Sequence, residues 1–307
     1  MDPSVTIDIV CVNYFSTELT RSLMQSLERE SYRHIVLVDN SDSDAEFANL
    51  VDLAAEFDCL AVRMEGNTGF GAAVNYGAMK AGVEPSSFLW VLNPDTVSTS
   101  AAGPRLVENL LARNVDLSSP RIVWGSEGDE AWFAGGAFDS RLGRTTHWKN
   151  VRALHPLTFL TAAALMIKGS AWLALGGFRD DLFMYWEDAD LSLRATKLGF
   201  VMGVDDTVTI WHAVGGTSSQ SGRSKLFHYY MQRNRIIVLR ENFGFRYCLG
   251  FWRMVESAKM IMRTRREPEQ AVLKACASIR GVFDGFFRSH YSADPLYGRD
   301  TDSAVRT

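Results

Sequence analysis

Two acidic segments hold the residue types that metal binding and acid–base catalysis require. The first is an apolar run, 88–92, that leads into Asn93, Pro94 and Asp95. Proline interrupts a β-strand, so the run predicts a strand that stops and presents Asp95 just beyond its end. A carboxylate in such a place can hold a hard divalent cation, which takes oxygen ligands and often a substrate phosphate. The same aspartate can equally cap the next helix or form an Asx turn.

The second acidic segment places Glu187, Asp188 and Asp190 at the start of a predicted helix. Apolar residues at helical spacing from 191 to 198 support that helix. Acids at a helix N-terminus are stabilised by capping and by the helix dipole, which often suffices to explain them. Three acids among aromatic residues exceed what capping needs. Close carboxylates raise one another's pKa, which suits a general base.

A histidine and a glycine-containing segment are weaker candidates. His212 follows a predicted strand at 208–210 and precedes a predicted mobile loop, 215–219, and loops often carry function. A lone histidine is nevertheless more often structural. Gly69 and Gly71 begin a predicted helix, where backbone N–H groups can approach a phosphate. A dinucleotide-binding fingerprint is not met, because Val74 occupies its last glycine position and the segment follows the third strand. This argues against an NAD-dependent enzyme.

Alternating strand and helix patterns must position these residues. We predict strands at 5–12, 35–38, 60–63 and 88–92, and helices at 19–28, 45–57 and 71–81. This alternation implies an α/β fold with a mostly parallel sheet flanked by helices. Ligands bind at the C-terminal ends of the strands in such sheets. That rule singles out Asn13, Asp39 and the Asn93–Asp95 turn.

The second half of the chain is mixed and then wholly helical. We predict a helix at 101–113, strands near 118–123 and 159–167, and a helix that begins at Glu187. From Arg223 onward the pattern is helical, with a weak stop at 242–244. We therefore predict one domain over 1–242 and a helical C-terminal extension over 243–307.

The C-terminal extension is basic and amphipathic. Residues 246–290 hold nine Lys or Arg and four Asp or Glu, a balance of +5 in a chain whose net charge is -4. Apolar residues recur at helical spacing over 251–262 and 279–287. Such helices can lie on an anionic membrane surface. They can also pack on the domain or on a second subunit.

Composition limits the remaining classes. A net charge of -4 over 307 residues gives no reason to expect nucleic-acid binding. The four cysteines are scattered without a CxxC pair, so neither a zinc site nor a disulfide framework is indicated, and a reducing cytoplasm fits. No stretch offers the ~18 apolar residues of a spanning helix. We expect a soluble or peripheral protein.

Taken in order, these segments resemble glycosyltransferase family 2, and within it the rhamnosyltransferase-like branch. The resemblance covers about residues 6–242. Its pieces are Val12-Asn13-Tyr14, Val38-Asp39-Asn40-Ser41, Asn67 to Gly71 with Asn75, Leu92 to Thr96, Phe183 to Leu191, Trp211-His212 and Arg233-Asn234. The ordered set is more specific for the family than for the donor sugar.

The resemblance implies a GT-A fold, which is Rossmann-like, with a nucleotide-binding half over 1–97 and an acceptor-binding half over 98–242. It implies transfer of a sugar from a nucleotide-diphosphate donor with inversion. By this resemblance Asp39 contacts the donor base, and the rest of the donor site is formed by Asn13, Asn67, Gly69, Gly71, Asn75, Asn93 and Asp95. Asp95 and His212 would bind Mg²⁺ or Mn²⁺. Asp188 would be the catalytic base, with Glu187 and Asp190 beside it.

Two departures from the family pattern matter. Asn93 stands where the Asp-x-Asp metal motif has its first acid, which is common in the rhamnosyltransferase-like branch but leaves one carboxylate fewer for the metal. Thr161-Ala162 stands where many relatives have Gly-Ala, which bears on the acceptor pocket.

The resemblance favours L-rhamnose from dTDP-rhamnose, transferred to a glycan or polyprenyl-linked acceptor in cell-surface polysaccharide synthesis. A galactofuranosyl- or hexosyltransferase that uses a UDP-sugar is the nearest alternative. A protein of another class, which binds nucleotide sugars without turnover, would bind donor regardless of Asp188. Because acceptors of the family are often lipid-linked at the inner leaflet, we expect a peripheral enzyme on the cytoplasmic membrane face. A homo-oligomer also fits.

Overall fold

The computed structural model describes residues 5–124, 130–151, 156–212 and 222–287 of the 307-residue chain. The chain forms two compact units. The first contains 1–138, 145–180 and 187–216, and the second contains 139–144, 181–186 and 217–307. The boundary predicted at 242/243 stays a prediction. The predicted loop at 215–219 lies outside the described residues.

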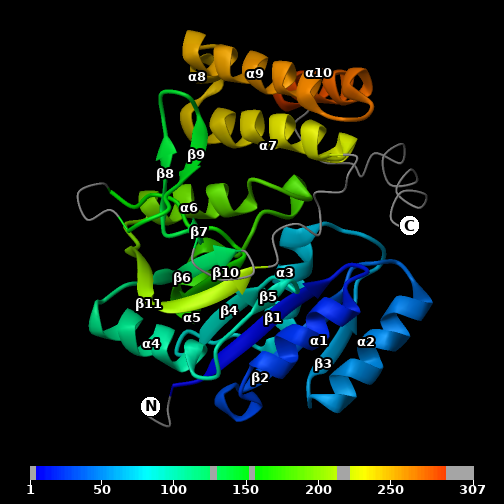
Figure 1. The fold of residues 1–307 in the computed structure, drawn as a ribbon. Coiled ribbons are helices and arrows are strands. Elements are labelled where there is room, and N and C mark those ends of the chain that lie inside the picture. The colour runs from blue at the N-terminus through cyan, green and yellow to red at the C-terminus, as the bar shows by residue number, and fades with distance from the viewer. Residues whose placement is uncertain (1–4, 125–129, 152–155, 213–221, 288–307) are drawn as a thin grey trace. The chain divides into compact units, whose positions relative to one another are not determined.

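The first unit is built on a mixed sheet with the order β3-β2-β1-β4-β10-β6-β11-β5, and β7 pairs with β6 (Figure 1). The strands are β1 (Ile7–Asn13), β2 (His34–Asp39), β3 (Leu60–Arg63), β4 (Phe88–Leu92), β5 (Thr96–Val97), β6 (Leu117–Trp124), β7 (Glu130–Phe133), β10 (Ala164–Lys168) and β11 (Met202–His212). The four N-terminal strands are parallel, as predicted. β10 is antiparallel to both β4 and β6, and this makes the sheet mixed.

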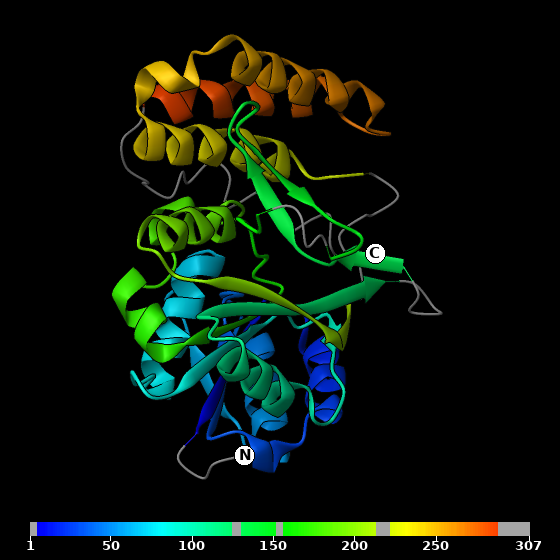
Figure 2. The same ribbon diagram turned by 90° about the vertical axis from the view of Figure 1, so that its left-hand side faces the viewer.

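Helices cover both faces of this sheet. They are α1 (Thr17–Ser26), α2 (Asp44–Glu56), α3 (Phe70–Ala81), α4 (Ala102–Ala112), α5 (Gly169–Leu175) and α6 (Glu187–Lys197). Figures 1 and 2 show α1 and α2 on one face and α3 and α5 on the other. α3 approaches the strands closely, because a Cβ on Gly77 would stand 2.6 Å from Cγ1 of Val10. The predicted helices and strands of the first third are all confirmed, with ends that move by one or two residues.

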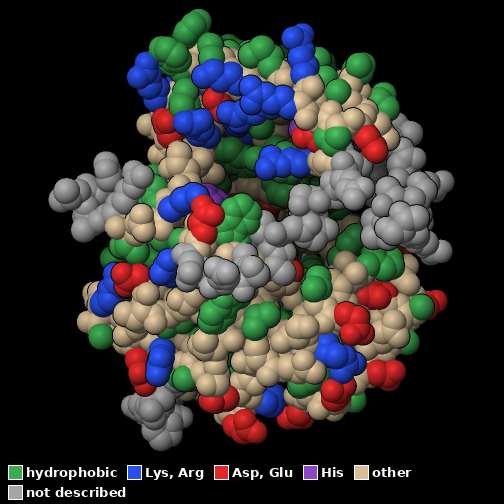
Figure 3. Space-filling model, viewed as in Figure 1, with side chains coloured by type: hydrophobic (Ala, Val, Ile, Leu, Met, Phe, Trp, Pro, Cys, Tyr) green, Lys and Arg blue, Asp and Glu red, His purple; other side chains and the backbone are tan. Residues whose placement is uncertain are grey.

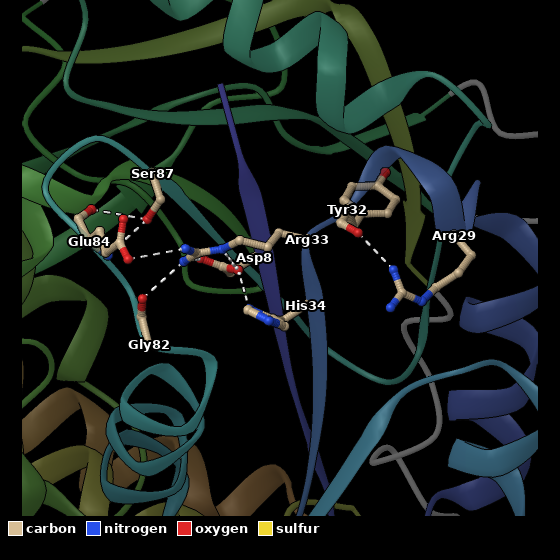
Figure 4. A network of polar contacts seen from close by, with 8 residues as sticks. All are labelled: Asp8, Arg29, Tyr32, Arg33, His34, Gly82, Glu84 and Ser87. Carbon is tan, nitrogen blue, oxygen red and sulfur yellow. Dashed lines mark hydrogen bonds and ion pairs between the residues drawn. The ribbon is translucent and has the colours of Figure 1, made fainter. Parts of the chain in front are cut away.

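A buried ion pair stabilises the sheet near the N-terminal ends of β1 and β2. The candidate site lies at the opposite, C-terminal ends of these strands. Asp8, in β1, is fully buried, and its two carboxylate oxygens accept hydrogen bonds of 2.9 and 2.6 Å from Arg33. His34 Nδ1 lies 3.2 Å from the same carboxylate (Figure 4). Arg33 also donates to the carbonyl of Gly82, at the end of α3. The bidentate pair explains how a charged residue is accommodated in an otherwise apolar strand.

The second unit is mainly helical, with α7 (Lys225–Phe243), α8 (Phe245–Cys248), α9 (Phe251–Arg263) and α10 (Ala271–Phe287). α7 ends at the predicted stop, where Gly244 has a φ of +89°. A small two-stranded sheet, β8 (Gly136–Asp139) with β9 (Arg144–His147), has its turn in this unit. No helix among the described residues is both long enough and apolar enough to cross a membrane.

α9 and α10 bury their polar sides and expose apolar ones. Glu256 and Ser257 are the buried residues of α9. Lys274, Ser278 and Asp284 are buried in α10, where Asp284 accepts a 2.7 Å hydrogen bond from Tyr229. The exposed apolar residues are Phe251, Trp252, Met262, Val272, Leu273, Ile279, Phe283 and Phe287, which we call the C-terminal apolar surface. Figure 3 shows basic and hydrophobic side chains interspersed over these helices.

Candidate functional site

Asn13 and Asp39 stand side by side at the ends of β1 and β2. They are partners in the parallel register, and both side chains are fully buried. The amide of Asn13 donates to Glu46 at 2.9 Å and accepts from Ser16 at 2.9 Å. Asp39 Oδ1 accepts from the backbone of Ser41, whereas its Oδ2 accepts no hydrogen bond from the described residues. A buried carboxylate oxygen in that state can accept a hydrogen bond from a ligand.

Asn40 organises the loop that leads into α3. Its side chain donates to Asn67 Oδ1 at 3.1 Å and accepts from the backbone of Thr68 at 2.9 Å. Asn67 Oδ1 also accepts from the backbone N–H of Gly69, whose φ of +90° favours glycine. The predicted pocket residues Asn67 and Gly69 therefore lie together at the end of β2.

Gly71 and Asn75 lie on the part of α3 that packs against the segment before α6. A Cβ on Gly71 would stand 2.9 Å from the carbonyl oxygen of Arg179. Asn75 donates to the carbonyl of Phe178 at 2.7 Å and accepts from its N–H at 2.9 Å. Asn75 also donates to Asp180. These contacts explain both residues as packing and positioning groups, without reference to a ligand.

Asp95 and His212, the two predicted metal ligands, lie next to each other. Their nearest atoms, Oδ1 and Nε2, are 3.1 Å apart, and both side chains are largely buried. Neither ring nitrogen of His212 makes a well-aligned hydrogen bond within the described residues. Two ligands that each stand about 2.1 Å from one ion, at right angles, are about 3 Å apart. The pair thus fits two neighbouring ligands of a divalent cation.

A cation at this pair would have few protein ligands. Among the described residues, no group of three or more His, Cys, Asp or Glu side chains is arranged to hold a metal ion. Mg²⁺ commonly binds through one or two protein ligands and completes its shell with waters and substrate phosphates. Mixed nitrogen and oxygen ligation also suits Mn²⁺.

Glu187 and Asp188, at the start of α6, have strongly perturbed acidities. Burial raises the pKa of Glu187 to about 8, and the charge of Asp188 adds to this. Burial also raises the pKa of Asp188, to about 6. The rise is smaller because hydrogen bonds from the backbone of Ala189 and Ala162 and from the Thr161 side chain favour the ionised form. Glu187 Oε2 has no such partner. Near neutral pH, Asp188 is mainly ionised and Glu187 mainly protonated.

The segment 161–163 connects the acidic pair with the Asn93–Asp95 turn. Thr161 and Ala162 hydrogen-bond to Asp188. The carbonyl of Ala163 accepts from the N–H of Asn93 at 2.9 Å. Asn93 in turn accepts through its carbonyl from Thr96, which closes the turn that contains Asp95. One short segment therefore holds both acidic motifs at the same edge of the sheet.

Asp190 differs from its two acidic neighbours. Its side chain is almost fully buried, and Oδ2 accepts a 2.6 Å hydrogen bond from Arg194 one turn later. Arg194 also donates to the carbonyls of Leu175 and Gly177. These contacts hold α6 against the end of α5, so Asp190 fits a structural acid better than a proton acceptor.

Sequence reasoning missed three contributors. Thr161 was noted only as a departure from a family pattern, and Asn40 only as a strand end. Trp132, in β7, was not noticed, although its ring lies 5.0 Å from that of His212. None of the three carries a local signal of its role, because each acts through contacts with residues distant in sequence.

Comparison with known proteins identifies the family. The family model described as glycosyl transferase family 2 matches residues 6–170, more than half of the chain. The chain belongs to glycosyl transferase family 2. The match contains Asp39, Asp95 and Thr161 and ends before α6. The comparison with curated protein sequences found no match for this family member.

Solved structures of glycosyltransferases share its fold. GalNAc-T7 in complex with UDP, GalNAc and Mn²⁺ superposes with a TM-score of 0.60 at 16% identity, over 84% of this chain and 54% of that one. TarS from S. aureus superposes with a TM-score of 0.52 at 13% identity, over 92% of this chain and 55% of that one. A mannosyltransferase from Pyrobaculum calidifontis in complex with GDP-Man and Mn²⁺ superposes with a TM-score of 0.55 at 10% identity, over 92% of this chain and 87% of that one. The family 2 chain thus spans just over half the length of the first two. At these identities the likeness shows the GT-A-like fold, and the predicted α/β class is confirmed.

Proposed function

We propose that this chain is a metal-dependent, inverting glycosyltransferase that moves a sugar from a nucleotide-diphosphate donor to a glycan or polyprenyl-linked acceptor. The observation that carries the proposal is the link through 161–163, which ties the ionised Asp188 to the turn of Asp95. A proton acceptor and a cation ligand held by one segment suit transfer to a hydroxyl group. The family and the neighbouring structures support the same chemistry.

The donor nucleotide would bind at the ends of β1 and β2. Oδ2 of Asp39 accepts no hydrogen bond from the described residues and lies 3.6 Å from Nε of Arg63, so it can accept a hydrogen bond from an N–H of the base. Asn13 supports the strand end beside it, and Asn67 and Gly69 shape the adjoining loop. Backbone N–H groups near the start of α3 suit a phosphate. Gly71 and Asn75 would act behind this pocket by holding α3 against 178–180.

Asp95 and His212 would hold Mg²⁺ or Mn²⁺ together with the donor diphosphate. When bound, such an ion neutralises charge that develops on the leaving nucleotide. The 3.1 Å separation of His212 Nε2 from Asp95 Oδ1, without a well-aligned hydrogen bond at either ring nitrogen, supports this assignment. Asn93, which replaces an acid, supports the turn through its backbone and adds no charge.

Asp188 would accept the proton of the acceptor hydroxyl as that oxygen attacks the anomeric carbon. A base with a pKa of about 6 is mainly ionised at neutral pH and still basic enough to take a proton in the transition state. Glu187, mainly protonated, would keep the site from accumulating two adjacent charges. Asp190 would orient α6 through Arg194.

The donor proposed first is dTDP-rhamnose, because Asn93 in the metal motif resembles the rhamnosyltransferase-like branch. UDP-galactofuranose and UDP-hexoses are the alternatives. A panel of these donors, assayed for nucleotide release with and without Mn²⁺, tests the proposal. We expect Mn²⁺-dependent release that is fastest with dTDP-rhamnose. Faster release from a UDP-sugar would favour the alternative, and donor binding without turnover by any donor would favour a binding protein.

The C-terminal apolar surface would hold the enzyme on the cytoplasmic face of an anionic membrane. Support comes from the exposed Phe251, Phe283 and Phe287 and from the +5 balance of residues 246–290. On this proposal the C-terminal extension over 243–307 is the membrane-binding part, and lipid-linked acceptors would meet the enzyme at that surface. A homo-oligomer is the other occupant that such a surface suits.

A further inference from the structure

The four residues before α6 adopt an unusual backbone. Phe183, Tyr185 and Trp186 have φ values of 65°, 65° and 74°. This left-handed region favours glycine, and bulky aromatic residues are rarely found there. Such conformations persist only where the surrounding structure holds them, and they cluster at functional sites. The strained stretch runs directly into Glu187, the first residue of α6.

A single buried amide holds this stretch. Asn234, in α7, is fully buried, and its Nδ2 lies 2.7, 2.7 and 2.9 Å from the carbonyl oxygens of Leu182, Met184 and Tyr185. Three carbonyls that converge on one amide nitrogen fix the path of the backbone between them. Replacing this donor would remove one hydrogen bond from each of the three carbonyl groups at once.

Arg233 fixes the orientation of that amide. Its Nη1 donates to Asn234 Oδ1 at 2.7 Å, so the Nδ2 atom must face the three carbonyls. The two Nη atoms also donate to the carbonyl of Asp181 at 3.3 Å. Adjacent residues of α7 therefore bind the beginning and the middle of the strained stretch.

Aromatic packing from the same helix adds to these bonds. The ring of Phe183 stacks on Tyr230 at 5.0 Å, and the ring of Tyr185 meets Phe227 edge-on at 5.2 Å. Residues 181–186 and α7 belong to the same compact unit. Packing alone can hold side chains, but the positive φ values require that the carbonyls be held as well.

We propose that Asn234, oriented by Arg233, is a positioning residue that holds the strained 182–186 stretch and so fixes where the chain presents Glu187 and Asp188. The inference rests on the proposed function in assigning a catalytic role to Asp188. The geometry of the amide and its three carbonyls stands independently of that role. Asn234 need not touch a substrate, because it acts through the backbone that enters α6.

Gln232 provides a matched control on the same helix. It is as fully buried as Asn234, and its amide nitrogen also donates to a backbone carbonyl, that of Ser257, at 2.9 Å. Its second acceptor is Ser278 in α10. Its hydrogen bonds thus go to α9 and α10 and not to the 182–186 stretch. Gln232→Ala removes a buried amide without releasing that stretch.

The experiment compares full-length wild type, Asn234→Ala and Gln232→Ala by infrared spectroscopy across pH. A protonated carboxyl group absorbs apart from carboxylates, and Glu187→Gln identifies the contribution of Glu187. Release of the strained stretch lets water reach the acidic pair, which favours ionisation. We therefore expect the Glu187 titration to move to lower pH by about one unit or more in Asn234→Ala, and to stay within about 0.3 unit of wild type in Gln232→Ala.

With any donor from which wild type transfers a sugar, kcat and KM provide a second measurement. We expect kcat of Asn234→Ala to fall about tenfold or more while KM for the donor stays within about threefold. Gln232→Ala should keep kcat within about threefold, even if it melts at a lower temperature. Equal Glu187 titrations in wild type and Asn234→Ala, or equal kcat losses in the two alanine variants, would overturn the proposal.

Two further outcomes are separable. Asn234→Ser retains one hydroxyl donor and should give an intermediate titration. If both Asn234 variants fail to fold while Gln232→Ala folds, the residue serves folding and the proposal fails. If wild type shows no transfer with any donor, the proposed function fails, yet the infrared titrations still decide whether Asn234 positions the acidic pair.

Discussion

Burial raises the pKa of two adjacent carboxyl groups in this chain by different amounts, to about 8 for Glu187 and about 6 for Asp188. Both Glu187 and Asp188 are desolvated, and burial is the largest cause that raises each pKa. Asp188 receives several hydrogen bonds that favour its ionised form. Glu187 has a single backbone hydrogen bond of this kind, its Oε2 receives none, and the charge of Asp188 raises its pKa further. Residues whose environments drive their pKa values apart are the usual signature of an acid–base assignment. This difference supports the proposal that Asp188 is the base.

Asp188→Asn tests that role. The substitution is nearly isosteric but cannot accept a proton, so turnover should fall by about 10² or more while donor affinity stays roughly intact. The measurement is kcat together with the donor dissociation constant. Asp190→Asn, which breaks the contact with Arg194, should lower stability more than it lowers kcat. Turnover of Asp188→Asn within a few-fold of wild type would move the role to Glu187 or Asp190.

Thr161→Val tests the tuning of the base. Loss of the hydroxyl removes a hydrogen bond that lowers the pKa of Asp188, so this pKa should rise above about 6. If Asp188 is the base, as proposed, the acidic limb of the kcat–pH profile should then move to higher pH. Thr196→Val is the control, since its exposed hydroxyl donates to the backbone of α6 alone. A kcat–pH profile of Thr161→Val whose acidic limb moves to lower pH, or does not move, would contradict a hydrogen bond from Thr161 to Asp188.

Glu187→Gln tests the burial of the second carboxyl through stability. A carboxyl whose pKa rises on folding favours the folded chain below its ordinary value of 4.5, and this contribution is lost as the pH rises through about 8. The glutamine variant does not titrate there. Its melting temperature relative to wild type should therefore be higher at about pH 8.5 than at about pH 5.

The control for this stability measurement is Glu108→Gln, on the exposed side of α4, which should show no such change between the two pH values. A difference between wild type and Glu187→Gln that is the same at both pH values would show that Glu187 is not protonated in the folded protein.

At the scale of elements, the sequence predicts what repeats locally. The runs at 60–63 and 88–92 and the helix ends at Ala81 and Phe243 agree with β3, β4, α3 and α7, because strand-forming residues and glycines act where they stand. The short strands β7 to β9 and helix α5 escaped prediction. They are defined by pairing and packing with residues far along the chain.

The C-terminal helices show a further limit of sequence patterns. The apolar spacing of 251–262 predicts an amphipathic helix, and α9 is one. Periodicity does not say which side is buried. Glu256 lies inward because Arg144, more than a hundred residues earlier, stands 3.7 Å from it. The same limit applies to the site, where the acids were predictable as motifs but the support from Thr161 and Asn234 was not.

The C-terminal apolar surface predicts binding to anionic vesicles. Phe283→Glu with Phe287→Glu should reduce co-sedimentation, because the change removes apolar insertion and lowers the charge balance of residues 246–290 from +5 to +3. Each basic residue near an anionic surface contributes about 1 kcal/mol to the free energy of membrane binding. At physiological ionic strength, salt screens this attraction beyond about 8 Å. Binding should therefore weaken at high salt. Leu111→Glu, an equally exposed site on α4, is the control.

Vesicle binding that is equal in wild type and the double variant, or that shows no preference for anionic lipid, would refute docking by this surface. Size-exclusion chromatography of the same variants tests whether a second copy of the chain binds this surface instead. A dimer of wild type that is lost in the double variant would assign the surface to a second copy of the chain.

At the scale of the whole molecule, the chain belongs to glycosyl transferase family 2, and its reaction is proposed. The family model covers residues 6–170, and α6 and His212 lie beyond it. The strands of the proposed nucleotide site are therefore within the matched part, whereas the proposed base and one proposed metal ligand are not. The glycosyltransferases that share the fold were solved with nucleotide and Mn²⁺ in two cases. Whether this chain couples a metal to donor binding is the step on which the proposed reaction depends.

Isothermal titration calorimetry, which measures the affinity for the nucleotide-diphosphate donor with and without Mn²⁺, tests that step directly. Wild type should bind the donor more tightly with Mn²⁺, and so should Asp206→Ala, an exposed acid on β11 that serves as control. Asp95→Ala should abolish the Mn²⁺ dependence, because it removes one of the two proposed protein ligands, and His212→Ala should weaken it in the same direction. The same Mn²⁺ dependence in Asp95→Ala as in wild type would contradict the account.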